Sequence, residues 1–252
     1  MLNIVIPMAG AGSRFAKAGY IDPKPLIRIH DEPMIKLVIN NLRPNQPHRF
    51  IFICQSDHVK AYNLTEKLTE WAPNSIIIQI DGLTEGAACT VLAAKEFINN
   101  QQPLMIANSD QYVDICINNY LNYQILNKLD GLIMTMTATD PKWSFVKLNE
   151  QNVATEVVEK QVISNEATVG IYNYRCGSDF IEAAEKMIVN NERVNNEFYV
   201  APVYNQLIRQ GQKIGIYNIG SEANGMYGLG IPQDLELFLS LPVSKTAIGQ
   251  KP

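Results

Sequence analysis

The chain of 252 residues has few of the residues on which several common kinds of chemistry depend. Its three histidines, His30, His48 and His58, show no spacing with acids or serines that would indicate a catalytic triad or a zinc site. Its four cysteines are scattered and form no C-x-x-C pair, which argues against a metal clamp or a redox motif. We expect reduced thiols, as in a cytoplasmic protein.

The chain also lacks a surplus of positive charge and a long apolar segment. Its formal net charge is −4, with a pI of about 5.5, so no broad basic field favours nucleic acid. The apolar run at the N-terminus is too short for a signal peptide, and no stretch approaches the length of a membrane span. These features predict a cytoplasmic protein without a nucleic-acid or membrane partner. Any anion site must then be local, which favours a small phosphorylated ligand.

The most informative stretch lies near the N-terminus. Ile4 to Met8 is mostly apolar and predicts a buried strand, which ends in the small residues Ala9, Gly10, Ala11, Gly12 and Ser13. Such residues let the backbone approach a ligand closely and turn its N–H groups toward phosphate oxygens. The stretch is neither a Walker loop, since no Gly-Lys-Ser/Thr follows, nor a complete G-x-G-x-x-G fingerprint. A tight turn without a ligand is the simpler alternative for the glycines alone.

Two cations strengthen the phosphate interpretation. Arg14 follows the small residues directly and offers a fork-shaped guanidinium suited to phosphate. Lys24 lies between Pro23 and Pro25, which hold it in a stiff, extended segment. We therefore predict that a polyphosphate lies between the glycine loop and the side chains of Arg14 and Lys24.

The order of elements predicts an α/β fold: a three-layer, Rossmann-like, mainly parallel sheet with helices on both faces and a mixed-strand second half. In the first half, strands at 50–54, 75–80 and 104–107 alternate with helices at 34–42, 57–71 and 85–99. The second half has strands at 131–138, 145–148, 153–158, 167–174 and 213–219 and helices at 179–190, 196–210 and 232–239. We predict one domain over 1–252, with a nucleotide-binding half at about 1–115, an acceptor-binding half at about 116–240 and a loose tail at 241–252.

Asp110 comes shortly after the predicted strand 104–107. Ligands of such sheets bind beyond the carboxyl ends of the strands, where the glycine loop also lies. A carboxylate there suits Mg²⁺, a hard cation that prefers oxygen ligands. A helix cap or a solvated loop acid is the alternative.

Together these residues resemble the sugar-nucleotide pyrophosphorylases, nucleotidyltransferases with a fold of the glycosyltransferase-A type. The family consensus L-A-G-G-x-G-T-R-L, then P-K, then K-P-M-I, is similar to the glycine loop with Arg14, to Pro23-Lys24 and to Glu32-Pro33-Met34-Ile35. This loop is one residue shorter and has Ser13 in place of threonine. The resemblance implies a triphosphate clamp made by Arg14 and Lys24, and a metal ligand at Asp110.

The resemblance also implies roles for residues whose own pattern leaves them ambiguous. Asp81-Gly82-Leu83 is identical to the start of the family's base-contacting segment, which implies nucleotide binding by Gly82, Glu85 and Gly86. An ordinary turn into a helix is the alternative. Glu159-Lys160 and the Gly170 strand resemble elements near the acceptor, with Lys160 near its phosphate, and Glu197 occupies the place of a further acidic element.

One position departs from the family pattern. Where many relatives have an aspartate in W-x-D-x-G-T-P, a second metal ligand, this chain has Gly228. Either one carboxylate suffices, or Asp234 or another acid replaces it, or activity is lost.

The sequence therefore predicts an Mg²⁺-dependent transfer of a nucleoside monophosphate from CTP, UTP or dTTP to a phosphorylated small molecule, with release of pyrophosphate. The acceptor could be a sugar 1-phosphate, an alcohol phosphate or a phosphoglutamine-like compound, in a branch associated with capsule or lipopolysaccharide precursors and including cytidylyltransferases. A homo-oligomer would be usual among related enzymes. The alternatives are a nucleotide-sugar-dependent glycosyltransferase of the same fold and an inactive nucleotide-binding regulator.

Overall fold

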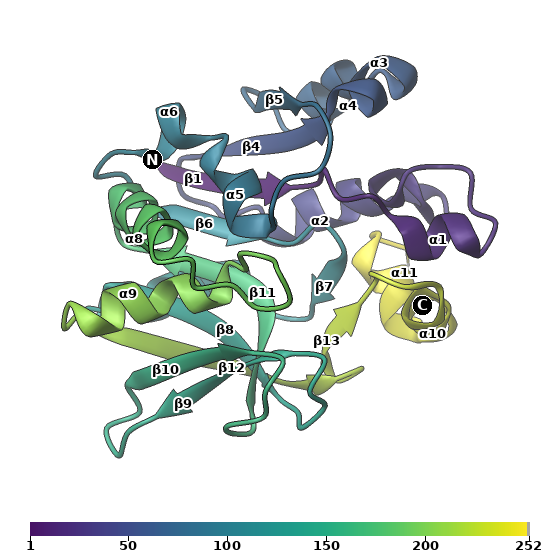
Figure 1. Ribbon diagram of the computed structural model, residues 1–252. Coiled ribbons are helices and arrows are strands. Elements are labelled where there is room, and N and C mark those ends of the chain that lie inside the picture. The colour runs from purple at the N-terminus through teal and green to yellow at the C-terminus, as the bar shows by residue number, and fades with distance from the viewer. Residues whose placement is uncertain (251–252) are drawn as a thin grey trace.

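A computed structural model describes residues 1–250 and contains one large mixed sheet (Figure 1). The strand order along its main path is β5-β4-β1-β6-β11-β8-β12-β13-β7. The first four strands are parallel, with bounds β5 Ile76–Ile80, β4 His48–Gln55, β1 Leu2–Pro7 and β6 Leu104–Ala107. Their carboxyl ends therefore meet at one edge, from which the glycine loop, the turn at Asp81 and the segment containing Asp110 all emerge.

The second half of the chain mixes strand directions. Strand β11 runs antiparallel to its neighbours β6, β8 and β9, whereas β12 is parallel to β8. The bounds are β7 Gln111–Val113, β8 Gly131–Thr137, β9 Ser144–Leu148, β10 Ala154–Glu159, β11 Glu166–Tyr174, β12 Ile214–Glu222 and β13 Gly225–Gly228. A separate hairpin joins β2 Arg28–Ile29 to β3 Glu32–Pro33. The predicted fold, a mainly parallel first half with a mixed second half, is confirmed.

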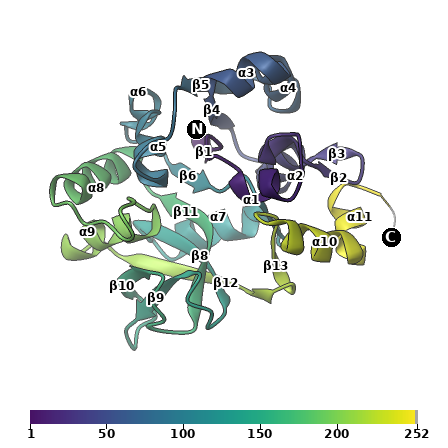
Figure 2. The same ribbon diagram turned by 45° about the vertical axis from the view of Figure 1, so that its right-hand side comes forward.

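Helices cover both faces of the sheet (Figures 1 and 2). Their bounds are α1 Ser13–Lys17, α2 Met34–Leu42, α3 Ser56–Tyr62, α4 Leu64–Trp71, α5 Ala87–Leu92, α6 Lys95–Ile98, α7 Ile117–Leu126, α8 Gly177–Val189, α9 Tyr204–Arg209, α10 Pro232–Ser240 and α11 Pro242–Ala247, with short 3₁₀ turns η1 Lys24–Leu26 and η2 Ala201–Val203. Within residues 1–250, no helix is both long and apolar enough to cross a bilayer.

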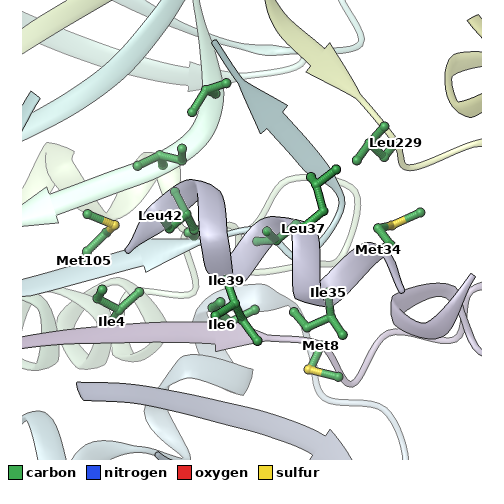
Figure 3. Close-up of a cluster of buried hydrophobic side chains, with 14 of the residues drawn as sticks. Ile4, Ile6, Met8, Met34, Ile35, Leu37, Ile39, Leu42, Met105 and Leu229 are labelled. Atoms are coloured by element: carbon green, nitrogen blue, oxygen red, sulfur yellow. The ribbon is translucent and has the colours of Figure 1, made fainter. Parts of the chain in front are cut away.

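The alternation of side chains along β1 divides the core into two layers. Ile4 and Ile6 belong to the cluster that includes α2, and Figure 3 shows them beneath that helix. Val5 points to the opposite face, where the cluster includes α5, α8 and α9. Each fully buried aliphatic side chain contributes roughly 1.5–3 kcal/mol. The well-packed strand β1 therefore gives the glycine loop that follows it a rigid support.

Several predicted elements differ in detail from the structure. The helix predicted at 57–71 is two helices, because Asn63 adopts a left-handed conformation with φ of 51°. The helix predicted from 85 begins at Ala87, since Gly86 has φ of 130°, and it is interrupted before Lys95. The helix predicted at 196–210 begins only after Val200.

The prediction of a loose tail from Pro242 onward is also wrong. Residues 242–247 form α11, and Ser244 within it is fully buried. The Ser244 hydroxyl lies 2.9 Å from His30 Nε2 and bonds to the carbonyl of Leu241 at 2.8 Å. These contacts fix the segment against the early part of the chain. The last two residues of the predicted tail lie outside the described residues.

Candidate active site

The glycine loop and Lys24 face a common cavity. Gly12 has φ of 59°, which favours glycine, and a Cβ atom built on it would lie 3.5 Å from Cβ of Lys24. A cavity of about 180 Å³ is lined by Gly10, Ala11, Gly12 and Lys24, with residues 20–23 and two side chains of α3 completing it. Backbone groups of the glycine loop and the cation of Lys24 therefore line this space, together with one acid, Asp22.

Lys24 also reaches the predicted metal ligand. Its Nζ lies 2.7 Å from Oδ2 of Asp110, although the two residues are 86 positions apart in sequence. Both side chains are about one-fifth exposed, at 22% and 21%. The sequence reasoning named each residue separately, and the fold brings them together at the carboxyl edge of the sheet.

Arg14 lies on α1 with an exposed side chain. The short helix is anchored by Phe15, which is buried and whose ring packs edge-on against Tyr20 at 5.1 Å between centroids. Within residues 1–250, the guanidinium makes no ion pair or hydrogen bond. It therefore remains available to a ligand, and its predicted role in phosphate binding stays a prediction.

Gln55, which sequence reasoning did not single out, joins the glycine loop to the predicted base-binding turn. Its side-chain amide donates to the carbonyl of Ala9 at 2.7 Å and to that of Gly82 at 2.8 Å. Gly82 has φ of 74°, and no atom lies within 4 Å of the position a Cβ atom would occupy. The turn therefore presents an open backbone face beside the loop, and contact of this face with a base stays a prediction.

Glu85 and Gly86 bind the segment around residue 198. The carboxylate of Glu85 pairs with the guanidinium of Arg193 at 3.1 Å, and its carbonyl accepts from the Phe198 amide at 2.8 Å. A Cβ atom on Gly86 would lie 2.5 Å from the Phe198 backbone, so this position requires glycine. The contacts join the predicted nucleotide and acceptor sides, and nucleotide binding by these two residues stays a prediction.

A second cavity, of about 190 Å³, contains two of the predicted acceptor-binding residues, Glu159 and Gly170. Ser144 and Tyr199 also line it, and so does Asn108, two residues before Asp110. The backbone N–H of Asn108 donates to the carbonyl of Gly170 at 3.0 Å. The segment 108–110 therefore connects the acceptor cavity with the Lys24–Asp110 pair.

Glu159 is a buried carboxyl group in this cavity, 8% exposed, and it accepts a short hydrogen bond from the Ser144 hydroxyl. Burial raises the pKa of Glu159, an effect opposed by the Ser144 hydrogen bond and by Lys160. The Glu159 carboxylate can therefore accept hydrogen bonds from polar groups of a ligand. When it is protonated, it can also donate one.

The other two predicted acceptor residues, Lys160 and Glu197, do not line this cavity, and Lys160 reaches it only through its contact with Tyr199. Lys160 Nζ bonds to the hydroxyl of Tyr199 at 2.7 Å and lies 4.9 Å from the centre of its ring. This hydrogen bond raises the pKa of Lys160. Glu197 is exposed, close enough to Lys160 to influence its charge. Their contact with an acceptor stays a prediction.

Lys142 and Trp143 are further lining residues that no motif indicated. Lys142 Nζ bonds to Glu222 at 2.8 Å and lies 4.8 Å from the centre of the Trp143 ring. Burial alone would lower the pKa of Lys142, but the bond to Glu222 and neighbouring carboxylates raise it. The cavity therefore carries a cation of its own. Lysine before tryptophan in a loop has no distinctive spacing, so the sequence offered no signal for this role.

Beyond the end of β13, the first turn of α10 brings a further carboxyl group, Asp234, toward Asp110. A Cβ atom built on Gly230 would lie 2.7 Å from Oδ2 of Asp110, and one built on Gly228 would lie 3.2 Å from Oδ2 of Asp234. Partial burial raises the pKa of Asp234. Asp110 acts in the same direction, whereas Lys142 and Arg14 oppose it. Asp234 therefore lies within the electrostatic field of the predicted site.

The side chains present fit a magnesium ion. Asp110 offers a partly exposed carboxylate, the oxygen donor that Mg²⁺ prefers, beside the bare α-carbon of Gly230. Within residues 1–250, no three or more histidine, cysteine, aspartate or glutamate residues form a metal-binding group. Mg²⁺ is commonly held by one or two carboxylates together with substrate phosphates, which agrees with this donor set.

A larger cavity, of about 510 Å³, lies at the opposite edge of the sheet. Leu2 and Pro103, at the amino ends of β1 and β6, line it together with Leu121 and Leu129. None of the predicted site residues borders it. The carboxyl ends of parallel strands carry the ligand sites of such sheets, so we place the active site at the glycine loop despite the smaller cavities there.

The structure brings together a glycine loop, a lysine and a carboxylate at the carboxyl edge of the sheet, with a second cavity beside them. The sequence comparison gives the class directly: residues 4–215 match the nucleotidyl transferase family, and the chain belongs to it. The protein is therefore a nucleotidyltransferase. Comparison with curated proteins found no match.

Solved structures agree with this family. A nucleoside-diphosphate-sugar pyrophosphorylase from Vibrio cholerae RC9 is 26% identical, with a TM-score of 0.81 over 94% of this chain and 100% of that one. UDP-glucose pyrophosphorylase from Acinetobacter baumanii is 16% identical, with a TM-score of 0.70 over 95% and 92% of the two chains. The inositol-1-phosphate CTP transferase from T. maritima is 14% identical, with a TM-score of 0.74 over 98% and 94%. The last two share the fold.

Proposed function

We propose that this nucleotidyltransferase joins a nucleoside monophosphate, taken from a nucleoside triphosphate, to a phosphorylated small molecule and releases pyrophosphate. The observation that carries the proposal is the Lys24–Asp110 pair at 2.7 Å. Lys24 borders the cavity of the glycine loop, and the segment that ends in Asp110 borders the acceptor cavity. An α-phosphoryl group bound at this pair would face the triphosphate tail on one side and the acceptor on the other.

The reaction is an in-line displacement at the α-phosphorus. An oxygen of the acceptor phosphate forms the new bond to phosphorus, and the bond between the α-phosphorus and the oxygen bridging to the β-phosphorus breaks. No general base is needed, because a phosphate oxygen is already ionised at neutral pH. The absence of a histidine–acid pair from the sequence agrees with this chemistry.

Positioning and charge neutralisation supply the catalysis, because both reactants are anions. Amides of Gly10–Gly12 and the guanidinium of Arg14 hold the leaving pyrophosphate. Lys24 neutralises charge that develops on the α-phosphoryl oxygens. When bound at Asp110, Mg²⁺ supplies a Lewis-acidic centre for the phosphates. Lys142, which lines the acceptor cavity, and Lys160, which bonds to the lining residue Tyr199, attract the acceptor phosphate.

The substrates we propose are CTP, UTP or dTTP and a sugar 1-phosphate, an alcohol phosphate or a phosphoglutamine-like acceptor. Gly82 supports binding of a base, because its open backbone lies beside the glycine loop through the bridge of Gln55. The acceptor cavity, about 190 Å³ with a buried carboxyl group, supports a small polar acceptor. The resemblance supports a role in making precursors of capsule or lipopolysaccharide, in the cytoplasm.

The test is to incubate the protein with Mg²⁺, each common triphosphate and pooled phosphorylated metabolites. Pyrophosphate is measured by a coupled assay, and new nucleoside-diphosphate conjugates are identified by mass spectrometry. We expect pyrophosphate and one conjugate in equal amounts, formed only with the correct pair of substrates. A nucleotide-sugar donor tested in parallel should give no glycosyl transfer. Binding of triphosphates without any conjugate would contradict the proposal.

A further inference from the structure

Gly228 occupies the place at which the family pattern has a second metal-binding aspartate. Its φ lies outside the left-handed region, so the backbone there does not itself require glycine. What lies beside its bare α-carbon is a carboxylate from another element: Oδ2 of Asp234 is 3.2 Å from the position of a Cβ atom. The first turn of α10 thus brings an acid to the space that a side chain at position 228 would enter.

Asp110 approaches the neighbouring glycine in a similar way. Its Oδ2 lies 2.7 Å from the position a Cβ atom would take on Gly230. The segment is held in place because the Leu229 amide donates to the carbonyl of Asp110 at 2.8 Å, and Gly228 pairs with Gln111 between β13 and β7. The two bare α-carbons are two residues apart, and a carboxylate lies against each.

Asp234 lies in the first turn of α10, where the helix dipole favours a negative charge, but among the described residues its oxygens have no partner of their own. Within residues 1–250 its carboxylate makes no hydrogen bond or ion pair. It does not cap α10, which begins after Ile231 without a side-chain cap. The side chain is therefore an available oxygen donor at the edge of the proposed site.

We propose that Asp234 supplies the second protein carboxylate for the divalent cation, in place of the aspartate that Gly228 lacks. The inference rests on the proposed function, since nucleotidyl transfer is what requires the cation. Two carboxylates, with triphosphate oxygens and water completing the shell, form the kind of ligand set that Mg²⁺ and Mn²⁺ take in proteins. In this chain the second ligand has moved from the end of β13 to the first turn of α10.

The test measures cation binding separately from activity. Mn²⁺ is titrated into the protein with and without CTP, UTP or dTTP, and free Mn²⁺ is followed by electron paramagnetic resonance. Because loss of a group that supports a metal site costs about 10- to 100-fold in affinity, we expect Asp234→Asn and Asp110→Asn each to weaken Mn²⁺ binding at least tenfold. Glu236→Gln, which removes the same charge from an exposed position of α10, should bind like the wild type.

Moving the carboxylate back gives a sharper comparison. Asp234→Ala combined with Gly228→Asp restores the family arrangement and clears the oxygen 3.2 Å from the new Cβ atom. We expect this double variant to recover most of the Mn²⁺ affinity that Asp234→Ala loses. Wild-type affinity in Asp234→Asn, or no recovery in the folded double variant, would overturn the inference.

A measurement on the wild-type protein tests the same inference without relying on variants that could fail to fold. Fe²⁺ bound in place of Mg²⁺ is treated with ascorbate and peroxide, and backbone cleavage is mapped by mass spectrometry. Because Gly230 lies against Asp110, a cation held by Asp110 alone would cut near residues 110 and 228–231. We expect additional cuts within 233–236, beside Asp234, and their absence would overturn the inference. Lack of product in the transfer assay contradicts only the proposed reaction, so the two failures remain distinguishable.

Discussion

Replacing Lys24 with methionine removes the cation while keeping most of the side chain's volume. The lysine Cβ atom lies 3.5 Å from the position a Cβ atom would take on Gly12, and this contact is preserved in the variant. The ammonium group 2.7 Å from Asp110 is lost. The substitution therefore tests the charge at the junction of the two cavities rather than the packing of the loop.

The expected effect on turnover is large and that on stability is small. Loss of one electrostatic partner of a transition state costs about 10²- to 10³-fold in kcat, or about 2.7–4 kcal/mol. The pair contributes less to folding, because both side chains are about one-fifth exposed. Partly exposed ion pairs are worth on the order of 1 kcal/mol or less. The two magnitudes separate a catalytic from a structural role.

The assay is pyrophosphate release at saturating substrate, accompanied by chemical denaturation of the same samples. Lys17→Met is the matched control, since it removes a cation from an exposed position of α1, close to the loop. We expect the control to retain kcat within about threefold and Lys24→Met to lose at least a hundredfold. Turnover of Lys24→Met equal to that of Lys17→Met would refute the reasoning.

Three further predictions concern the acceptor cavity and the contacts around it. Lys142→Met removes a charged hydrogen-bond partner of the acceptor phosphate, worth about 1.5–3 kcal/mol. In steady-state assays the KM for the acceptor should therefore rise at least tenfold, while the KM for the nucleotide stays unchanged. Equal rises of both KM values would contradict the role of Lys142. The pKa of Glu159 is raised above 4.5, so the folded protein binds the extra proton and its free energy of unfolding falls as pH rises above that value. Between pH 4 and 8, the free energy of unfolding of the wild type should fall relative to that of Glu159→Gln as the pH rises, measured by chemical denaturation. A difference between the two proteins that does not change with pH would contradict the raised pKa. Gly86→Ala places a methyl group 2.5 Å from the Phe198 backbone and should cost about 2 kcal/mol or more by denaturation. Gly82 has φ of 74° but open space around its Cβ position, so Gly82→Ala should cost less, about 1–2 kcal/mol. A larger loss of stability in Gly82→Ala than in Gly86→Ala would contradict the close contact between Gly86 and the Phe198 backbone.

The parts of the fold that local pattern controls could be predicted from the sequence. Strand β1 is a nearly continuous apolar run and helix α2 has apolar residues at helical spacing, and the structure buries these positions. The alternation of strands and helices in the first half was sufficient to predict a mainly parallel sheet. Local conformational breaks were not predicted, because the left-handed Asn63 and the extended Gly86 interrupt stretches that otherwise favour helix.

Elements that depend on distant partners were missed. Strands β7 and β13 have three and four residues and are stabilised by pairing with each other across more than a hundred positions. Helix α7 was missed because asparagine and glutamine interrupt its apolar face, and α11 because its burial depends on a contact with His30. No local signal indicates such contacts.

The same distinction applies to the site. The glycine loop, Arg14, Lys24 and Asp110 belong to compact motifs, and the sequence was enough to propose them. The Lys24–Asp110 contact required the fold, as did the bridge made by Gln55. Lys142 and Trp143 belong to no motif, so only the structure revealed them as lining residues of the acceptor cavity.

The most direct test of the central claim is a crystal structure of the protein with Mn²⁺ and a non-hydrolysable α,β-methylene analogue of the triphosphate that supports transfer. We expect the phosphates to lie between Gly10–Gly12 and Lys24, with the base beside Gly82 and the metal on Asp110. Phosphates bound away from Lys24, or a nucleotide bound in the cavity beside Leu2 at the opposite edge of the sheet, would contradict the account.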